Sequence, residues 1–291
     1  MRANSSSMLE LITIPDLKSW RRAQRTAGRR VGFVPTMGFL HEGHLALVDE
    51  AKRRADEVIL SIFVNPLQFG PADDLARYPR DLPRDRGLAS ARGVDVIFVP
   101  TVAAMYPPRS EVRVSPGPIA ERWEGAARPG HFTGVLTVVA KLFHLVEPDI
   151  ACFGQKDVQQ LTLIRRMVED LNWPVEIVSV PTVRESDGLA LSSRNAYLGG
   201  DERGRAAVLS RALQAAHQAW RGGETSAREL ELRIRQELAK EPSVTVEYIS
   251  IADPTALTPV DSVDERTVVS LAARIGGTRL IDNIKLGEGI P

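Results

Sequence analysis

The sequence has little cysteine, no charge excess and no long apolar run. Cys152 is the one cysteine among 291 residues, so no internal disulfide can form and the fold does not depend on an oxidising compartment. Basic and acidic residues number 37 each, unlike the basic excess typical of proteins that bind nucleic acid or anionic membranes. No run reaches the ~18 apolar residues of a membrane span, and residues 1–7 lack the apolar stretch of a secretory signal. We therefore expect a cytoplasmic protein that binds neither nucleic acid nor membranes.

Apolar runs rich in valine, isoleucine and phenylalanine alternate with helix-like segments in the first part of the chain. The runs have the length and composition of short strands buried on both faces. They occupy residues 31–35, 58–64, 94–99 and 149–153. After His131 and after Lys156, apolar residues recur at spacings of three and four, as on one face of a helix. The alternation predicts an α/β fold with a mostly parallel sheet, and Cys152, inside the fourth run, is expected to be a core residue.

The pattern changes near residue 181. Residues 181–188 are polar and rich in turn formers, which is typical of a hinge or linker. The remainder predicts two helices and then three strands, at residues 201–221, 225–240, 244–251, 267–273 and 279–284. We therefore expect a second, smaller α+β domain.

The most informative motif is Pro-Thr-Met-Gly-Phe-Leu-His-Glu-Gly-His at residues 35–44. A buried strand ends at Pro35, a turn follows, and a helix is expected to begin near Gly43. Ligands of open α/β sheets bind at the carboxyl ends of strands, and a helix N-terminus there suits phosphate. His41 and His44 are three residues apart, so both imidazoles can face that point. In this context the pattern resembles the signature of nucleotidylyltransferase-like families.

Two other interpretations of the paired histidines carry less weight. Zinc metalloproteases space their histidines at i and i+4, whereas His41 and His44 are at i and i+3. Two solvated histidines would leave the adjacent glycine and strand unexplained. His144 and His217 lie in helical runs without companions and are interpreted as structural.

Two further segments carry groups that suit a nucleotide. In residues 153–157, Gly154 permits close approach of the backbone, Lys156 offers a mobile charge to phosphate, and Asp157 can accept from ribose hydroxyls. The same residues are also an acceptable helix start. Residues 188–195, Gly-Leu-Ala-Leu-Ser-Ser-Arg-Asn, offer two hydroxyls and a guanidinium to a triphosphate, although such a segment alone is a common polar loop.

Over nearly its whole length the chain resembles the pantoate–β-alanine ligase family. The blocks that carry the resemblance are Pro-Thr-Met-Gly (35–38), His-Glu-Gly-His (41–44), Ser-Ile-Phe-Val-Asn-Pro-Leu-Gln-Phe-Gly (61–70), Tyr-Pro-Arg (78–80), Arg-Pro-Gly-His-Phe-Thr-Gly-Val (128–135), Phe-Gly-Gln-Lys-Asp (153–157) and Arg-Glu-Ser-Asp-Gly-Leu-Ala-Leu-Ser-Ser-Arg-Asn (184–195). The resemblance implies a Rossmann-like parallel sheet with helices on both faces in residues 1–182, which bind ATP and pantoate. It also implies a C-terminal lid domain in residues 183–291 and a homodimer.

The implied reaction is Mg²⁺-dependent and has two steps. ATP and pantoate give pantoyl adenylate and pyrophosphate, and β-alanine then displaces AMP to form pantothenate. A carboxylate is already a nucleophile, so the first step needs charge stabilisation on the phosphates rather than a general base. The resemblance assigns this work to His41, His44, Lys156, Ser192, Ser193 and Arg194, with His41, His44, Lys156 and Arg194 as the catalytic set. It assigns the other ATP contacts to Met37, Gly154, Asp157, Val183 and Leu191.

Pantoate has two methyl groups, two hydroxyls and a carboxylate, so its site should combine apolar walls with a few polar anchors. By the resemblance, the anchors are Gln68 and Gln160. The implied walls include Pro35, Met37, Phe69 and Val139. Simple solvent exposure of Gln160 and ordinary packing of Phe69 stay open as alternatives.

The metal site is the least specific part of the resemblance. Asp85 matches the position of a carboxylate associated with Mg²⁺, but the flanking Arg84 and Arg86 disfavour a cation, and Asp81 is a rival. Arg128 and His131 either shape a loop of the active site or reach phosphate.

Two other functions stay open at this point. A nucleotidylyltransferase that adenylates a phosphate would share the histidine motif but would keep AMP in its product. A non-catalytic nucleotide sensor would bind ATP without turnover, and the full set of groups that suit phosphate argues against it.

Overall fold

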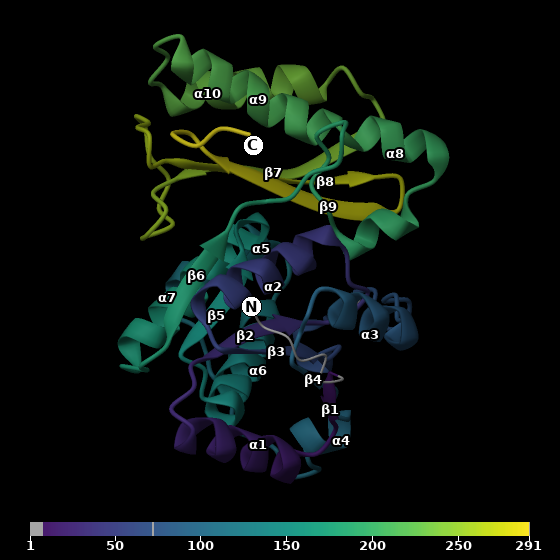
Figure 1. The fold of residues 1–291 in the computed structure, drawn as a ribbon. Coiled ribbons are helices and arrows are strands. Elements are labelled where there is room, and N and C mark those ends of the chain that lie inside the picture. The colour runs from purple at the N-terminus through teal and green to yellow at the C-terminus, as the bar shows by residue number, and fades with distance from the viewer. Residues whose placement is uncertain (1–7, 72, 291) are drawn as a thin grey trace. The chain divides into compact units, whose positions relative to one another are not determined.

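The computed structural model describes residues 8–71 and 73–290 (Figure 1). The prediction that residues 1–7 carry no secretory signal lies outside the described residues. The chain forms two compact units, each assembled from several segments. Of the described residues, the N-terminal unit comprises 8–71, 73–116, 130–154 and 163–180, and the C-terminal unit comprises 117–129, 155–162 and 181–290.

The N-terminal unit is built on a six-stranded parallel sheet with the order β1-β4-β3-β2-β5-β6. Its strands are β1 (Leu9–Leu11), β2 (Val31–Thr36), β3 (Glu57–Ile62), β4 (Val96–Phe98), β5 (Ile150–Gly154) and β6 (Glu176–Val180). The apolar runs predict β2 to β5, and these strands are confirmed. They do not reveal the edge strands β1 and β6. β1 has only three residues, with Glu10 in the middle, and β6 alternates half-buried with buried residues, so neither contains a long apolar run.

Helices cover both faces of this sheet (Figure 1). They are α1 (Ile14–Thr26), α2 (Glu42–Arg54), α3 (Leu82–Ala91), α4 (Val102–Met105) and α6 (His131–Val146), with the 3-10 turn η1 (Pro66–Gln68) and the later part of α7 (Val158–Asp170). Successive strand residues point to opposite faces. Val34 and Cys152 therefore lie in the core cluster that contains α2, whereas the preceding Phe33 and the following Phe153 lie edge-on to Phe143 of α6 at 6.3 and 6.2 Å between ring centroids. The predictions of an α/β fold and of a buried Cys152 are confirmed.

The C-terminal unit contains a three-stranded antiparallel sheet with the order β7-β8-β9. Its elements are α8 (Gly200–Ala206), α9 (Val208–Arg221), α10 (Ala227–Leu238), β7 (Val244–Ala252), β8 (Val268–Ile275) and β9 (Thr278–Lys285), with the short turns η2 (Pro118–Ala120), α5 (Glu124–Ala127), η3 (Gln155–Asp157) and η4 (Ser193–Tyr197). Leu213 of α9, Ile234 of α10 and Leu271 of β8 are fully buried together. The predicted α+β character is confirmed; the single helix predicted at residues 201–221 is interrupted at Ala207.

Residues 183–191 fold back on themselves within the C-terminal unit. Leu191 N–H donates to Val183 O at 2.9 Å, and Glu185 N–H donates to Leu189 O at 2.9 Å. Arg184 also donates to Asp282 of β9, so part of the predicted hinge at residues 181–188 is fixed to the C-terminal unit. Among the described residues of both units, no helix combines the length and apolar character that crossing a bilayer requires.

Candidate active site

A tight turn joins β2 to α2 and brings His41 and His44 together. Gly38 has a φ of +82°, and a Cβ there would lie 2.9 Å from Ile62 Cγ2, so the turn requires glycine. His41 is the N-cap of α2, and its backbone N–H lies 3.4 Å from His44 Nδ1. The ring centroids are 4.1 Å apart. Two imidazoles therefore lie at the positive end of a 13-residue helix, beyond the carboxyl end of β2.

Asp85 holds this turn from the first turn of α3. It is 1% exposed, and its two oxygens accept from Phe39 N–H at 2.8 Å and Leu40 N–H at 2.7 Å. Arg84 Nη1 donates to Leu40 O at 2.8 Å. Both carboxylate oxygens are thus occupied by backbone donors. Among the described residues, no three His, Cys, Asp or Glu side chains are grouped so as to hold a metal. These contacts do not fit the prediction that Asp85 ligates Mg²⁺.

Gln68 is held by Asn65, which sequence reasoning does not single out. Asn65 is 1% exposed, and its Nδ2 donates to Gln68 Oε1 at 3.0 Å and to Gly134 O at 3.1 Å. The Gln68 amide nitrogen then lies 3.2 Å from Met37 Sδ. The structure thus brings together two of the residues predicted around pantoate, Gln68 and Met37. An Asn before a Pro is a turn signal, and this signal is the only sequence feature that points to Asn65.

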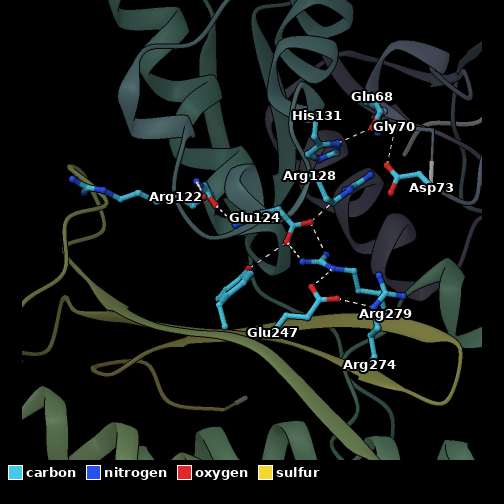
Figure 2. Close-up of polar contacts among 12 residues, drawn as sticks. Gln68, Gly70, Asp73, Arg122, Glu124, Arg128, His131, Glu247, Arg274 and Arg279 are labelled. Atoms are coloured by element: carbon cyan, nitrogen blue, oxygen red, sulfur yellow. Dashed lines mark hydrogen bonds and ion pairs between the residues drawn. The ribbon is translucent and has the colours of Figure 1, made fainter.

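The α6 helix packs closely on this corner. A Cβ on Gly134 would lie 2.1 Å from Leu67 O, so glycine is required for the approach. His131 at the start of α6 is buried, and its Nδ1 lies 2.9 Å from Gln68 O (Figure 2). Val139, further along α6, is 4% exposed. Of the two roles that the sequence leaves open for His131, these contacts favour the shaping of the loop that carries Gln68.

The other predicted wall residues lie at two places in the N-terminal unit. Pro35 lies in β2 and pairs with Ser61 of β3, so it stands at the carboxyl end of the sheet. The Phe69 ring packs edge-on to Tyr78 with 5.8 Å between centroids. Gly154 ends β5 at the same end of the sheet, and a Cβ there would meet no atom within 4 Å. Its role is therefore not dictated by packing.

In the C-terminal unit, Lys156 and Asp157 lie in η3. Asn283 of β9 donates from its side-chain nitrogen to Lys156 O at 2.7 Å and to Gln155 O at 3.1 Å. Asn283 is 4% exposed, so these bonds are shielded from water. They fix the backbone of η3 while Lys156 keeps its side chain for other contacts. No local sequence pattern predicts this role of Asn283, because it lies 127 residues from Lys156.

The Ser192–Arg194 segment forms a capped turn. Ser192 is the N-cap of η4, and its hydroxyl accepts from Arg194 N–H at 3.3 Å. Ser193 is buried, and Asn195 donates to Ala190 O at 3.2 Å. The Leu191–Val183 backbone bond brings those two predicted adenosine contacts side by side. The predicted ATP residues of this unit therefore occupy two short turns, η3 and η4, and the strand-like pair beside η4.

Glu124 is the centre of a buried charged cluster in the C-terminal unit (Figure 2). Arg279 of β9 donates to both of its oxygens at 2.7 and 2.8 Å, and Arg128 lies at 3.3 Å. The Tyr248 hydroxyl donates to Glu124 Oε2 at 3.3 Å. Burial, followed by the charge of Glu124, raises the pKa of Tyr248 above its usual value. Arg128 is thus oriented by Glu124, whose neighbours in sequence give no sign of this role.

The start of α7 belongs to the same cluster. Gln159 accepts from Glu124 N–H at 3.2 Å and donates to Arg122 O at 3.0 Å. The next residue, Gln160, is half-buried, so the alternative that its side chain is simply exposed to solvent is not favoured.

The residues predicted to bind ATP and pantoate divide between the two units. In the N-terminal unit they are Pro35, Met37, His41, His44, Gln68, Phe69, Val139 and Gly154. In the C-terminal unit they are Lys156, Asp157, Gln160, Val183, Leu191, Ser192, Ser193 and Arg194.

Comparisons with known proteins agree with one another. A family model for pantoate-beta-alanine ligase matches residues 10–285. The pantothenate synthetase of Roseiflexus castenholzii is 55% identical over 276 residues, which cover 95% of this chain and 98% of the relative. The crystal structure of pantothenate synthetase from Thermus thermophilus matches with a TM-score of 0.91 and 48% identity, over 96% of this chain and 99% of that chain. The pantoate-beta-alanine ligase from Francisella tularensis, complexed with beta-gamma ATP and beta-alanine, matches with a TM-score of 0.81 and 34% identity, over 98% of this chain and 100% of that chain.

Proposed function

The chain belongs to the pantoate–β-alanine ligase family, and we propose that the residues described above perform the family's reaction through an acyl adenylate. The protein condenses pantoate with β-alanine at the expense of ATP. In the proposed first step, a pantoate carboxylate oxygen attacks the α-phosphorus of ATP and pyrophosphate leaves. In the second, the β-alanine amine attacks the acyl carbon, and AMP leaves with one oxygen that came from pantoate.

The observation that carries this proposal is the pair of imidazoles at the N-terminus of α2. His41 and His44 lie where the dipole of a helix N-terminus favours an anion. We propose that they stabilise the negative charge that grows on the phosphates as pyrophosphate leaves. Asp85 supports them indirectly, because its bonds to Phe39 and Leu40 N–H fix the turn that precedes His41.

The C-terminal unit is proposed to supply the mobile cations. Lys156 extends from a turn whose backbone Asn283 fixes, and Arg194 extends from a turn capped by Ser192. A cation on a fixed backbone can follow a moving phosphate while its attachment point stays constant. The remaining proposed ATP contacts are Met37, Gly154, Asp157, Val183, Leu191, Ser192 and Ser193. We propose that residues 183–291 act as a lid that excludes water from the adenylate.

Pantoate is proposed to bind against Gln68, with Gln160 as the second anchor. The Gln68 nitrogen is a neutral donor beside Met37, which matches a molecule that combines oxygens with methyl groups. Pro35, Phe69 and Val139 are the other proposed walls.

Mg²⁺, the homodimer and a cytoplasmic location are also part of the proposal. Mg²⁺ typically keeps several waters and binds through substrate phosphates with one or two carboxylates. Because the bonds of Asp85 do not fit a ligand, we propose that the ion enters with ATP. The Francisella tularensis relative was crystallised with beta-gamma ATP and beta-alanine, which supports both as ligands of this chain.

An isotope experiment tests the route. Pantoate labelled with ¹⁸O in its carboxylate is incubated with the protein, ATP, Mg²⁺ and β-alanine, and the products are analysed by mass spectrometry. The adenylate route predicts equal amounts of amide and AMP, with one ¹⁸O in the AMP phosphate. Formation of ADP instead of AMP would indicate an acyl phosphate intermediate in place of the adenylate. AMP retained in the product would indicate a nucleotidylyltransferase, and bound ATP without turnover would indicate a sensor.

A reaction without β-alanine is the matched control. Pyrophosphate should then be released once per active site while AMP stays bound as the adenylate. Multiple turnovers without the amine would contradict a protected intermediate.

A further inference from the structure

Tyr106 lies outside the predicted site but is joined to it by two consecutive hydrogen bonds. Its hydroxyl donates to Asn65 Oδ1 at 2.9 Å, and Asn65 Nδ2 donates to Gln68 Oε1 at 3.0 Å. Tyr106 directly follows α4, and its ring centroid lies 5.9 Å from that of Phe63. Both the ring and the hydroxyl of Tyr106 are therefore fixed.

Two neighbours set the orientation of the Asn65 amide, because one of them can only donate a hydrogen bond and the other can only accept one. Leu67 N–H can only donate, and it lies 3.3 Å from Asn65 Oδ1. Gly134 O can only accept, and it lies 3.1 Å from Asn65 Nδ2. Together with the bonds to Tyr106 and Gln68, both N–H groups and both lone pairs of the buried amide are used. Oxygen and nitrogen of Asn65 cannot exchange places without breaking these bonds.

The orientation of the Asn65 amide in turn determines the orientation of the Gln68 amide. The atom of Gln68 that faces Asn65 must accept a hydrogen bond, so it is the oxygen. The nitrogen is left on the side of Met37 Sδ, 3.2 Å away. A fixed N–H donor of this kind can bond to any oxygen of the acid that accepts a hydrogen bond. The acid's carboxylate must face the phosphates that it attacks, so a hydroxyl oxygen is the matching group.

We propose that Tyr106 is a positioning residue that fixes Gln68 as a hydrogen-bond donor to a hydroxyl of the acid substrate. The inference rests on the proposed function, in which Gln68 binds pantoate. Without the Tyr106 hydroxyl, Asn65 Oδ1 retains only the longer bond from Leu67 N–H, and the amides of Asn65 and Gln68 are less firmly oriented. A Gln68 that is less firmly oriented holds the substrate hydroxyl less well, so the hydroxyl contributes less to discrimination.

Burial keeps the Tyr106 hydroxyl in its donor form. Burial raises the pKa of Tyr106 to about 12, with the charge of Arg113 opposing the shift. The hydroxyl is therefore protonated at any pH at which the enzyme would be assayed. Lys141 lies 5.8 Å from the ring centroid, with its nitrogen bonded to Met105 O, so the backbone beside Tyr106 is also fixed.

The test measures substrate discrimination rather than activity alone. The substrates are pantoate, its analogue without the 2-hydroxyl and its analogue without the 4-hydroxyl, each at saturating ATP and β-alanine. For wild type and Tyr106→Phe, kcat/KM is measured for all three acids, and KM is measured for ATP. Gln68→Leu, which removes the donor altogether, gives the limiting case.

The expected result is a loss of selectivity with the ATP site intact. Tyr106→Phe should lower kcat/KM for pantoate by about tenfold and leave KM for ATP within about twofold of wild type. The fall for one deoxy analogue should be much smaller, so discrimination against that analogue shrinks and identifies the hydroxyl. Gln68→Leu should shrink the same ratio further.

A purely structural role for Tyr106 predicts a different result. Partial unfolding lowers kcat/KM for every acid by the same factor, so the ratios do not depend on the folded fraction. Tyr248→Phe is the matched control, because it removes a hydroxyl that donates to Glu124 in the C-terminal unit, and it should leave both ratios unchanged. Unchanged ratios in Tyr106→Phe would overturn the inference. If wild type makes no amide from pantoate, the proposed function itself fails.

Discussion

The two units surround their proposed site residues with different contacts. In the N-terminal unit, Gln68 is fixed by the neutral amide of Asn65 and the hydroxyl of Tyr106. In the C-terminal unit, the neutral side chains of Asn283 and Ser192 fix the turns of Lys156 and Arg194, and buried ion pairs connect the segments around them: Arg279 with Glu124, and Arg184 with Asp282 at 2.7 and 3.0 Å. The two kinds of contact have different effects. Neutral bonds of defined polarity specify which atom of a side chain faces the ligand, whereas paired charges join distant segments of the chain.

The energetic consequences differ in the same way. A neutral bond contributes about 0.5–1.5 kcal/mol net, and a buried neutral partner that is left without its bond costs about 1–3 kcal/mol. A buried charge that loses its partner costs several kcal/mol, because its desolvation is no longer compensated. Arg184 and Asp282 have side chains only 5% and 2% exposed, so water cannot replace either partner. The charged connections should therefore dominate stability, and the neutral ones should dominate selectivity.

The largest expected effect is on the Arg184–Asp282 pair. Arg184→Met should lower the free energy of unfolding by about 3–5 kcal/mol, because it leaves the buried Asp282 carboxylate without its cation. The backbone N–H of Asn283 is then its remaining donor among the described residues. Urea unfolding followed by circular dichroism measures this change.

The double variant Arg184→Met with Asp282→Leu sharpens the comparison. Removing both charges should recover most of the loss, since the penalty belongs to the unpaired carboxylate rather than to the missing bond. A double variant as unstable as the single one would contradict this account.

Lys156→Ala comes next in size and acts on catalysis. Loss of a cation that stabilises the transition state should slow adenylate formation at least ~100-fold, measured as pyrophosphate release in a single turnover. The control is Lys285→Ala, which removes a surface cation that pairs with Glu288 in the same unit. An Lys156→Ala rate within about tenfold of wild type would remove Lys156 from the proposed catalytic set.

Sequence patterns predict the parts of this molecule that depend on local order. The central strands are revealed because burial on both faces produces continuous apolar runs, and the helix that begins at Glu42 follows from the turn chemistry before it. The roles of Asn65, Asn283 and Glu124 are not predicted, because their partners lie up to 155 residues away in sequence. The membership of residues 117–129 in the C-terminal unit is hidden for the same reason.

Asp85→Asn tests a contact that is intermediate between a neutral hydrogen bond and an ion pair, because a charged side chain here accepts from neutral backbone N–H groups. An amide can accept at one oxygen only, so the variant should lose one charge-assisted bond and about 2 kcal/mol of stability. The Mg²⁺ concentration for half-maximal activity should stay as in wild type. A large increase in that concentration would restore Asp85 as a metal ligand and contradict its assignment to the turn.

The smallest effect is expected at Cys152, where neither kind of polar contact operates. Burial raises the pKa of its thiol to about 12 from 9.0, so the native protein at pH 8 should react with a thiol reagent only as fast as it opens. The raised pKa also means that the contribution of Cys152 to stability is complete below pH 9.0 and declines as the pH rises from there towards 12. Cys152→Ala should therefore lose less stability than wild type between about pH 9 and 10.5, measured by urea unfolding at each pH. Equal losses in the two proteins would show that the thiol ionises as easily in the core as in the unfolded chain.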